Sequence, residues 1–292
     1  MADSCVTFDA MVNGLPVHAI YPEEALQQVL LPLLRQLTAL WKKKGSRLVV
    51  FLAAPPGAGK STLAAFLEDL SGKTPGVHPL QAVGLDGFHY PNAWLDTHTT
   101  RRDGKEVLLR TIKGAAETFD VDALQRKLAA LRAGNVRFPI YDRRLHDVVP
   151  EALPVTGDIV LLEGNWLLLA DPRWGVIAPF ADFSVLILCE EALVRERLIG
   201  RKVQGGLTRE QAEAFYQDSD AKNVHRVLTQ SREADLTLVL SGDGSLTPVP
   251  EKKEGRRPQD PAPSAAVQQS APNRGRKAAD RRDHLPDGSA IV

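Results

Sequence analysis

The chain has 292 residues, and its 36 Lys and Arg are balanced by 36 Asp and Glu, so the net charge at pH 7 is zero. A nucleic acid or an anionic membrane usually requires a basic excess in its partner, so this balance argues against both. Two cysteines are too few for a disulfide framework, no apolar run is long enough to span a bilayer, and the N-terminal residues lack the pattern of a signal peptide. We therefore expect a cytoplasmic protein with no membrane and no nucleic-acid partner.

The first strongly periodic segment covers residues 22–43 and predicts a helix. Pro22 suits its first turn, whereas Pro32 is expected to kink its interior. Apolar residues recur on one face at helical spacing, namely Leu26, Val29, Leu30, Leu33, Leu34, Leu37 and Leu40. We expect this helix to pack on the sheet of a domain that covers residues 1–242.

A glycine-rich loop then joins a buried strand, residues 48–52, to a second helical pattern. Strand, glycine-rich loop, Lys-Ser-Thr and helix is the arrangement of a phosphate-binding P-loop. Its expected phosphate-binding residues are Pro56, Gly57, Ala58, Gly59, Lys60, Ser61 and Thr62. Lys60 would reach the β- and γ-phosphates, and the Ser61 hydroxyl would bind Mg²⁺. Ala54 stands where the consensus has its first glycine, which requires a negative φ there; the alternative is an ordinary turn.

The rest of the first 242 residues alternates between strands and helices. Strands are predicted at residues 80–85, 159–162, 183–188 and 236–240, and helices at 121–132, 190–202 and 208–229. Asp120 is the expected N-cap of the first of these helices, and Thr208 with Gln211 forms a capping box for the last. A polar stretch, residues 91–118, is long enough to be a functional loop region. This order predicts a three-layer α/β/α fold with a mostly parallel sheet.

The composition changes near residue 243. From there to residue 292 the chain is rich in Pro and charged residues and has few large apolar ones. Such a segment cannot bury enough surface to offset its ordering entropy, so we predict a disordered tail.

Three further features could carry chemistry. Asp86 follows a predicted strand at the edge where parallel sheets place ligands, and could accept a proton from an attacking hydroxyl. Glu163 ends a buried strand, where an acid needs a partner such as Mg²⁺ and its water. Arg197 and Arg201 share one helix face and could close over a transferring phosphate. The alternatives are a capping carboxylate for Asp86 and a solvated helix face for the arginines.

Five motifs occur in one order along the chain: PGAGKST (residues 56–62), LDGFH (85–89), KGAAETFD (113–120), YDRRLHD (141–147) and EGNWLLL (163–169). Together they resemble the superfamily of uridine kinase, phosphoribulokinase and type I pantothenate kinase. The resemblance runs from the P-loop strand to Leu240 and is greatest to a bacterial branch described as nucleoside/nucleotide kinase-like, some members of which are suspected sugar kinases. It implies a P-loop kinase fold with a helical lid.

The resemblance also implies roles for site residues. Asp86 resembles the catalytic Asp of an Asp-x-Phe motif, and Glu163 resembles the acid that orients Mg²⁺ and its water. Arg197 and Arg201 fall in the arginine-bearing lid of the family.

The substrate side of the resemblance is mixed. Tyr141 and His146 keep the separation with which uridine kinases hold the nucleobase, and His89 lies inside a matching motif. Lys113 belongs to a loop that looks more like the pantothenate kinase version.

These inferences lead to one principal hypothesis, an ATP-dependent and Mg²⁺-dependent kinase that phosphorylates a hydroxyl of a nucleoside or a sugar. Pantothenate is the next acceptor to consider. A P-loop NTPase without a small acceptor and a nucleotide-binding protein without catalysis are the alternatives. The spacing of Cys and His residues does not suggest a zinc site. The sequence leaves open whether the protein forms a homodimer.

Overall fold

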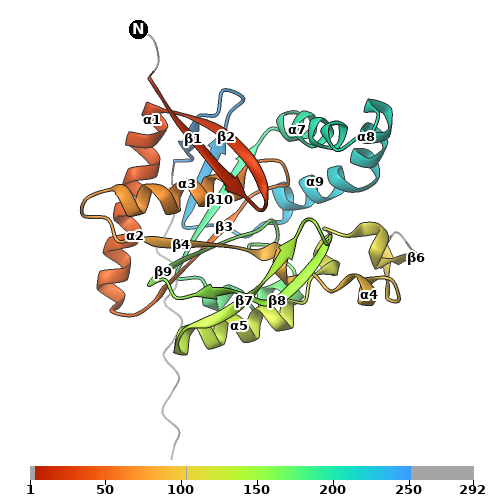
Figure 1. The fold of residues 1–292 in the computed structure, drawn as a ribbon, viewed down its shortest axis with the longest axis horizontal. Coiled ribbons are helices and arrows are strands. Elements are labelled where there is room, and N and C mark those ends of the chain that lie inside the picture. Colours follow the sequence, from red (N-terminus) through yellow and green to blue (C-terminus); the bar gives the residue numbers. More distant parts are fainter. Residues whose placement is uncertain (1–3, 103, 251–292) are drawn as a thin grey trace, which may run out of the picture. The chain divides into compact units, whose positions relative to one another are not determined.

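The computed structural model describes residues 4–102 and 104–250, and a single sheet lies at the centre of this part of the chain (Figure 1). Its strands lie in the order β12-β11-β10-β3-β9-β4, and β12 alone runs antiparallel to its neighbour among these described strands. Their bounds are β3 Leu48–Ala53, β4 Leu80–Gly84, β9 Ile159–Glu163, β10 Phe183–Cys189, β11 Leu236–Leu240 and β12 Leu246–Pro248. The predicted mostly parallel sheet is confirmed, and β3 lies between β9 and β10 in its middle.

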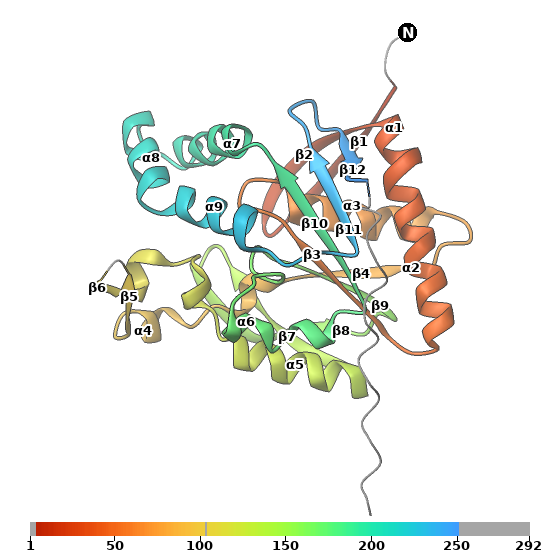
Figure 2. The same ribbon diagram turned by 180° about the vertical axis from the view of Figure 1, so that it is seen from behind.

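Helices cover both faces of this sheet, as Figures 1 and 2 show. Every residue of β3 is buried, and alternate side chains join two different hydrophobic cores. Leu48, Val50 and Leu52 pack with α2 (Leu31–Lys44), α3 (Lys60–Lys73) and α7 (Glu191–Gln204). Val49 and Phe51 pack on the other face with α5 (Val121–Ala133). The three-layer α/β/α prediction is therefore confirmed.

The predicted N-terminal helix is present and is helical from Glu23 to Lys44. It consists of α1 (Glu23–Ala25), a π-helical turn (Leu26–Leu30) and α2. Pro32 lies in the first turn of α2, directly after the wider π turn, which is where the ring of a proline and its missing N–H can be accommodated. The helix ends at Gly45 in the left-handed conformation.

The predicted caps are also present. The Asp120 carboxylate accepts a hydrogen bond from the Ala123 N–H at the start of α5. Thr208 and Gln211 form the reciprocal capping box of α8 (Arg209–Phe215), which continues through a π turn (Tyr216–Asp220) into α9 (Ala221–Gln230).

Three antiparallel hairpins were not predicted. They are β1 (Cys5–Val12) with β2 (Leu15–Pro22), β5 (Thr99–Arg102) with β6 (Lys105–Leu108), and β7 (Val136–Asp142) with β8 (Asp147–Val155). The second hairpin, α4 (Asn92–Leu95) and two 3₁₀ turns (Leu109–Ile112, Ala116–Thr118) occupy the stretch expected to be a loop region. Further short turns are a 3₁₀ turn after β4 (Leu85–Phe88), α6 (Pro172–Gly175) and another 3₁₀ turn (Ala178–Phe180).

The predicted domain boundary after residue 242 is wrong by several residues. Leu246–Pro248 form β12, which pairs with β11 because Leu246 is apolar enough to join the core beside Leu240. Residues 251–292, the rest of the predicted tail, lie outside the described residues.

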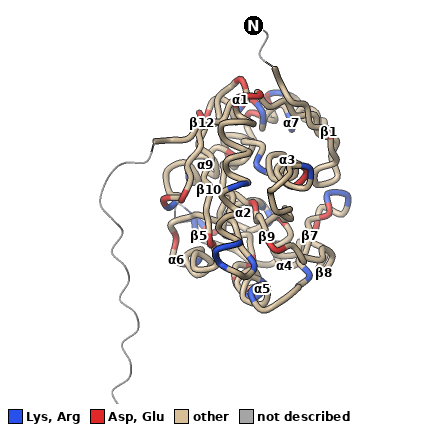
Figure 3. The backbone as a smooth tube through the Cα atoms, turned by 90° about the vertical axis from the view of Figure 1, so that its left-hand side faces the viewer, with Lys and Arg blue, Asp and Glu red and all other residues tan. Residues whose placement is uncertain are grey.

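The described residues carry both signs of charge, with Lys and Arg interspersed with Asp and Glu along the backbone in Figure 3. Among the helices of these residues, none has the length and apolar character needed to cross a membrane.

Candidate active site

The P-loop connects β3 to α3, as the sequence predicts. Gly57 has a φ of 81° and Gly59 a φ of 87°, a left-handed conformation that favours glycine. Ala54 is not among the described residues with positive φ, so alanine is tolerated at the first consensus position. The α3 helix begins with a hydrogen bond from the Leu63 N–H to the Gly59 carbonyl. Free backbone N–H groups and the N-terminus of a 14-residue helix therefore meet at this loop, which suits a phosphate group.

Gly57 also explains how α7, the predicted lid helix, reaches the P-loop. A Cβ at this position would lie 3.0 Å from Leu198 Cγ and 3.2 Å from the Val194 carbonyl oxygen, so α7 packs directly on the loop. Arg197 is exposed and lines a hollow of about 290 Å³ together with Gly59. The structure thus brings this arginine to the P-loop.

Arg201 lies elsewhere on α7. It is exposed, one turn further along the helix, and its charge opposes the effect of burial, which raises the pKa of the half-buried Asp220 carboxyl. The predicted lid pair is therefore divided, because only Arg197 lines the hollow at the P-loop.

Glu163 ends β9 and is placed beside the P-loop by the strand order. It pairs with Leu52 of β3 on one side and with Gly84 of β4 on the other. Its Oε1 accepts a 2.7 Å hydrogen bond from the Ser61 hydroxyl, and Lys60 Nζ lies 3.9 Å from its Oε2. The carboxyl is 6% exposed, and this burial raises its pKa, with the Asp86 charge acting in the same direction and Lys60 in the opposite one.

These residues fit a magnesium ion. Mg²⁺ is usually held by one or two carboxylates together with phosphate oxygens and water, rather than by a cage of protein ligands. A buried carboxylate next to the P-loop hydroxyl provides such a site in Glu163 and Ser61. Within the described residues, no cluster of three or more His, Cys, Asp or Glu could hold a metal by itself.

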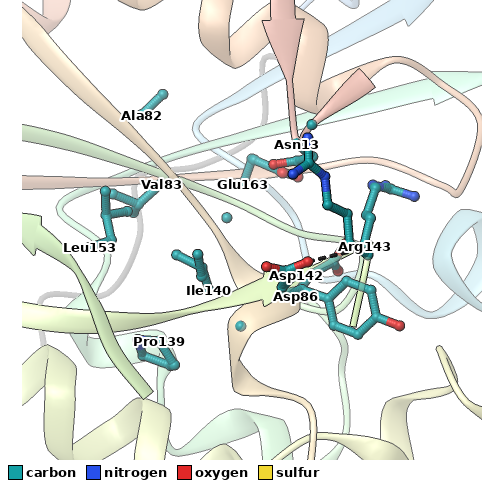
Figure 4. Close-up of a pocket in the computed structure, with 15 residues that line it drawn as sticks. Asn13, Ala82, Val83, Asp86, Pro139, Ile140, Asp142, Arg143, Leu153 and Glu163 are labelled. Atoms are coloured by element: carbon teal, nitrogen blue, oxygen red, sulfur yellow. Dashed lines mark hydrogen bonds between the residues drawn. The ribbon is translucent and has the colours of Figure 1, made fainter. Parts of the chain in front are cut away.

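Asp86 lies in the 3₁₀ turn that follows β4, and its half-buried side chain borders a pocket (Figure 4). The next residue, Gly87, permits β7 to cross closely over this turn. A Cβ on Gly87 would lie 2.1 Å from the Pro139 carbonyl oxygen and 2.9 Å from Ile140 Cα. This close approach brings Tyr141 near Asp86, and the negative charge of Asp86 adds to the effect of burial in raising the pKa of the Tyr141 phenol.

The pocket has a volume of about 470 Å³ and two chemically different sides. Figure 4 shows polar groups on one side and apolar ones on the other. The polar lining residues are Asn13, Asp86, Tyr141, Asp142, Arg143, Arg144 and Glu163. The apolar lining residues are Ala82, Val83, Pro139, Ile140 and Leu153. A ligand with hydroxyl groups at one end and an apolar body at the other would match this division.

His89, Lys113 and His146 are not among the residues that line the pocket, although His89 and Lys113 lie near the ring of Tyr141, which does line it. Lys113 Nζ donates to Asn92 Oδ1 at 2.6 Å and to the His146 carbonyl at 2.9 Å, and it lies 4.7 Å from the centre of the Tyr141 ring. Burial lowers the pKa of this lysine. The His146 side chain is exposed, and its backbone has a φ of 52°. Substrate contacts by these residues stay predictions.

His89 has a defined arrangement of its two ring nitrogens. Its Nδ1 lies 2.8 Å from the Asp86 carbonyl oxygen, to which it donates, so the buried Nε2 is left as an acceptor. Within the described residues Nε2 has no hydrogen-bond partner. The centre of the ring lies 3.8 Å from the centre of the Phe119 ring, with the two planes tilted by 35°, and burial lowers the pKa of the imidazole, which favours the neutral form.

The sequence interpretation missed Asn13 and Gly14, which also line the pocket. A signal was available, because Asn-Gly between two runs of alternating apolar residues is typical of a two-residue hairpin turn.

Comparison with known proteins identifies the family. Residues 49–242 match the model of the Phosphoribulokinase / Uridine kinase family. The chain belongs to this family. This family of P-loop kinases binds ATP, and the arrangement of Lys60, Ser61 and Glu163 around the loop agrees with that membership.

Three relatives illustrate the range of the family. The chain is 47% identical over 234 residues to the Escherichia coli (strain K12) protein YggC, covering 80% of this chain and 95% of that protein. It is 30% identical over 229 residues to a pantothenate kinase of Sinorhizobium medicae, covering 68% and 66% of the two chains. A crystal structure from Silicibacter sp. TM1040, described provisionally as a fructose transport system kinase, is 31% identical with a TM-score of 0.58, covering 69% of this chain and 98% of that one.

Proposed function

We propose that this kinase transfers the γ-phosphate of ATP to a hydroxyl group of a nucleoside or a sugar bound in the pocket beside Asp86. The observation that carries the proposal is the meeting of Asp86 and Glu163 in one pocket, with Glu163 bound to the P-loop hydroxyl of Ser61. One end of the pocket therefore borders the nucleotide, and the remainder can hold an acceptor.

In this reaction Asp86 accepts the proton of the acceptor hydroxyl as its oxygen bonds to the γ-phosphorus. The bond between that phosphorus and the bridging oxygen of ADP breaks, and ADP leaves with the electron pair. Lys60, the loop N–H groups and Arg197 stabilise the negative charge of the phosphate oxygens during transfer. Ser61 and Glu163 would hold Mg²⁺, which neutralises phosphate charge when it is bound. We place this reaction in the cytoplasm, where ATP is supplied.

The two sides of the pocket bear on the acceptor. Hydroxyl groups of a ribose or hexose would meet the polar side near Asp86, and a nucleobase or an aliphatic part would meet Val83 and Ile140. Pantothenate is the second candidate, because its chain also has a hydroxyl and an apolar branched part. The pantothenate kinases among the relatives support it as well.

The proposal is tested by ADP release from Mg·ATP with and without nucleosides, pentoses, hexoses and pantothenate. We expect one class of acceptor to stimulate release. Asp86→Asn should lower kcat by roughly 10²- to 10⁴-fold, the usual contribution of a general base, while ATP binding is kept. Hydrolysis that no compound in the panel stimulates would instead favour an NTPase without a small acceptor, and unchanged turnover in Asp86→Asn would reject Asp86 as the base.

A further inference from the structure

The N-terminal hairpin β1–β2 lies outside residues 49–242, the segment that defines the family, yet it borders both hollows of the site. Its tip, Asn13 and Gly14, lines the pocket beside Asp86. Residues 17–21 of β2 line the hollow that also contains Gly59 and Arg197. A segment outside the matched family residues therefore lines part of both hollows.

Apolar residues alternate with polar ones along the hairpin, and the apolar face holds it against the rest of the fold. Opposed residues on its inner face are apolar, including the pair of Phe8 with Ala19 and the pair of Val6 with Tyr21. The Phe8 ring lies 5.2 Å from the Phe66 ring on α3, and the Tyr21 ring stacks on Phe66 at 4.4 Å. Both rings are at least nine-tenths buried, so the hairpin is packed against the helix that begins at the P-loop.

The tip has a turn conformation that few residues adopt. Asn13 has a φ of 51° and Gly14 a φ of 77°, as in a type I′ turn, and asparagine tolerates this region better than most residues do. Within the described residues, the exposed Asn13 amide makes no hydrogen bond, and it lines the same pocket as Glu163 and Arg143, on the polar side in Figure 4. An amide can donate to and accept from hydroxyl groups at the same time.

We infer that Asn13 is a specificity-determining residue, whose amide binds a hydroxyl group of the acceptor other than the one that is phosphorylated. The hairpin would thereby select polyhydroxylated acceptors in this kinase. This inference rests on the proposed function, since it requires a small acceptor in the pocket beside Asp86.

The test compares Asn13→Gly with the full-length parent protein. Glycine adopts the left-handed conformation without strain, so the turn is kept while the amide is removed. Thr7→Ala is the matched control, because Thr7 is exposed on the outer face of β1 and lines neither hollow. With the best acceptor of the panel, we expect Asn13→Gly to raise the acceptor KM roughly three- to tenfold, as for the loss of one hydrogen bond, with the ATP KM unchanged.

Monodeoxy analogues of that acceptor provide a second measurement. The preference for the full acceptor over each analogue would not change if Asn13→Gly affected only folding. The analogue that lacks the hydroxyl bound by Asn13 should be a poorer substrate for the parent and for Thr7→Ala, but equal to the full acceptor for Asn13→Gly. An acceptor KM and an analogue preference that are both unchanged in Asn13→Gly would overturn this inference and leave the kinase proposal standing. If no acceptor stimulates the parent, both are rejected.

Discussion

At the scale of single residues, Glu163 connects the fold to the chemistry. The sequence predicted an acid at the end of a buried strand, and the structure places that acid against Ser61. Which strand would lie beside β3 could not be read from the sequence, because continuous apolar runs such as residues 159–162 specify burial but not neighbours. The position of the acid at the end of a buried strand was therefore predictable, and its hydrogen-bond partner was not.

Because Glu163 is buried, we expect its charged form to lower the free energy of unfolding when no ligand is bound. Its pKa is raised by burial, so the folded chain binds this proton more tightly than the unfolded chain does. The stabilisation from the proton is complete below the ordinary glutamate pKa and is lost as the pH rises through the higher pKa of the folded state. Glu163→Gln, neutral at every pH, should therefore have a higher Tm than the parent at pH 8.

Thermal unfolding of both proteins without nucleotide, measured from pH 4 to pH 8, checks this prediction. The difference in Tm should grow with pH, and a gain of about 1 kcal/mol would correspond to roughly 2–4 °C in a chain of this size. Gln retains an oxygen that can accept from Ser61, so that hydrogen bond is kept in the variant. A lower Tm for Glu163→Gln at pH 8 would show that attraction to Lys60 outweighs the cost of burial.

At the scale of elements, the sequence predicted the parts with strong periodicity and missed the hairpins. Residues 48–52 are a continuous apolar run, residues 183–188 are apolar except for Ser184, and both segments are strands of the central sheet. The β7–β8 hairpin carries Pro139, Pro150 and Pro154, which interrupt the pattern of a strand. Because β7 brings Tyr141 to the pocket, the shape of the acceptor site could not be predicted even though Tyr141 itself was.

The contact between β7 and the turn after β4 leads to a prediction for Gly87. In Gly87→Ala the new Cβ would meet backbone atoms of Pro139 and Ile140, which cannot rotate away as a side chain can. We expect a loss of roughly 1–3 kcal/mol in the free energy of unfolding, typical of overpacking, together with a lower kcat because Asp86 and Tyr141 move apart. Urea unfolding and ADP release with the best acceptor measure the two effects.

Gly72 provides the matched control, since it lies within α3 and a Cβ there would meet nothing within 4 Å. Gly72→Ala should raise the free energy of unfolding by at most about 0.5–1 kcal/mol, the value for a helix interior, because Gly72 lies in the last turn of α3, and activity should be unchanged. Equal stability of Gly87→Ala and Gly72→Ala would mean that the crossing of β7 over the turn is not tightly packed.

At the scale of the described part of the molecule, the nucleotide site is assembled from segments that are distant in the sequence. The P-loop follows β3, Glu163 ends β9, and Arg197 belongs to α7, which packs on the loop at Gly57. All of these segments belong to the central sheet or to the helices that cover it. A ligand that binds them together should therefore stabilise the fold as a unit, because it binds the folded chain and not the unfolded one.

This coupling predicts that Mg·ATP raises the Tm, and that part of the rise depends on the metal. At a concentration of one hundred times Kd, a ligand stabilises the folded state by about 2.7 kcal/mol, which corresponds to a Tm rise of roughly 5–11 °C. ATP with EDTA should give a smaller rise in the parent. In Glu163→Gln the difference between the rises with Mg²⁺ and with EDTA should become smaller, since one of the two groups that would hold the metal, Ser61 and Glu163, has lost its charge.

Two further variants separate binding from chemistry in the same measurement. Asp86→Asn should keep the full Tm rise, because in the proposed reaction Asp86 acts on the acceptor proton and not on the nucleotide. Lys60→Ala should lose most of the rise with or without Mg²⁺, because its ammonium group would bind the β- and γ-phosphates directly. A metal-dependent rise of undiminished size in Glu163→Gln would mean that Glu163 does not hold the magnesium ion. Glu163 would then be a buried carboxyl that only orients the Ser61 hydroxyl.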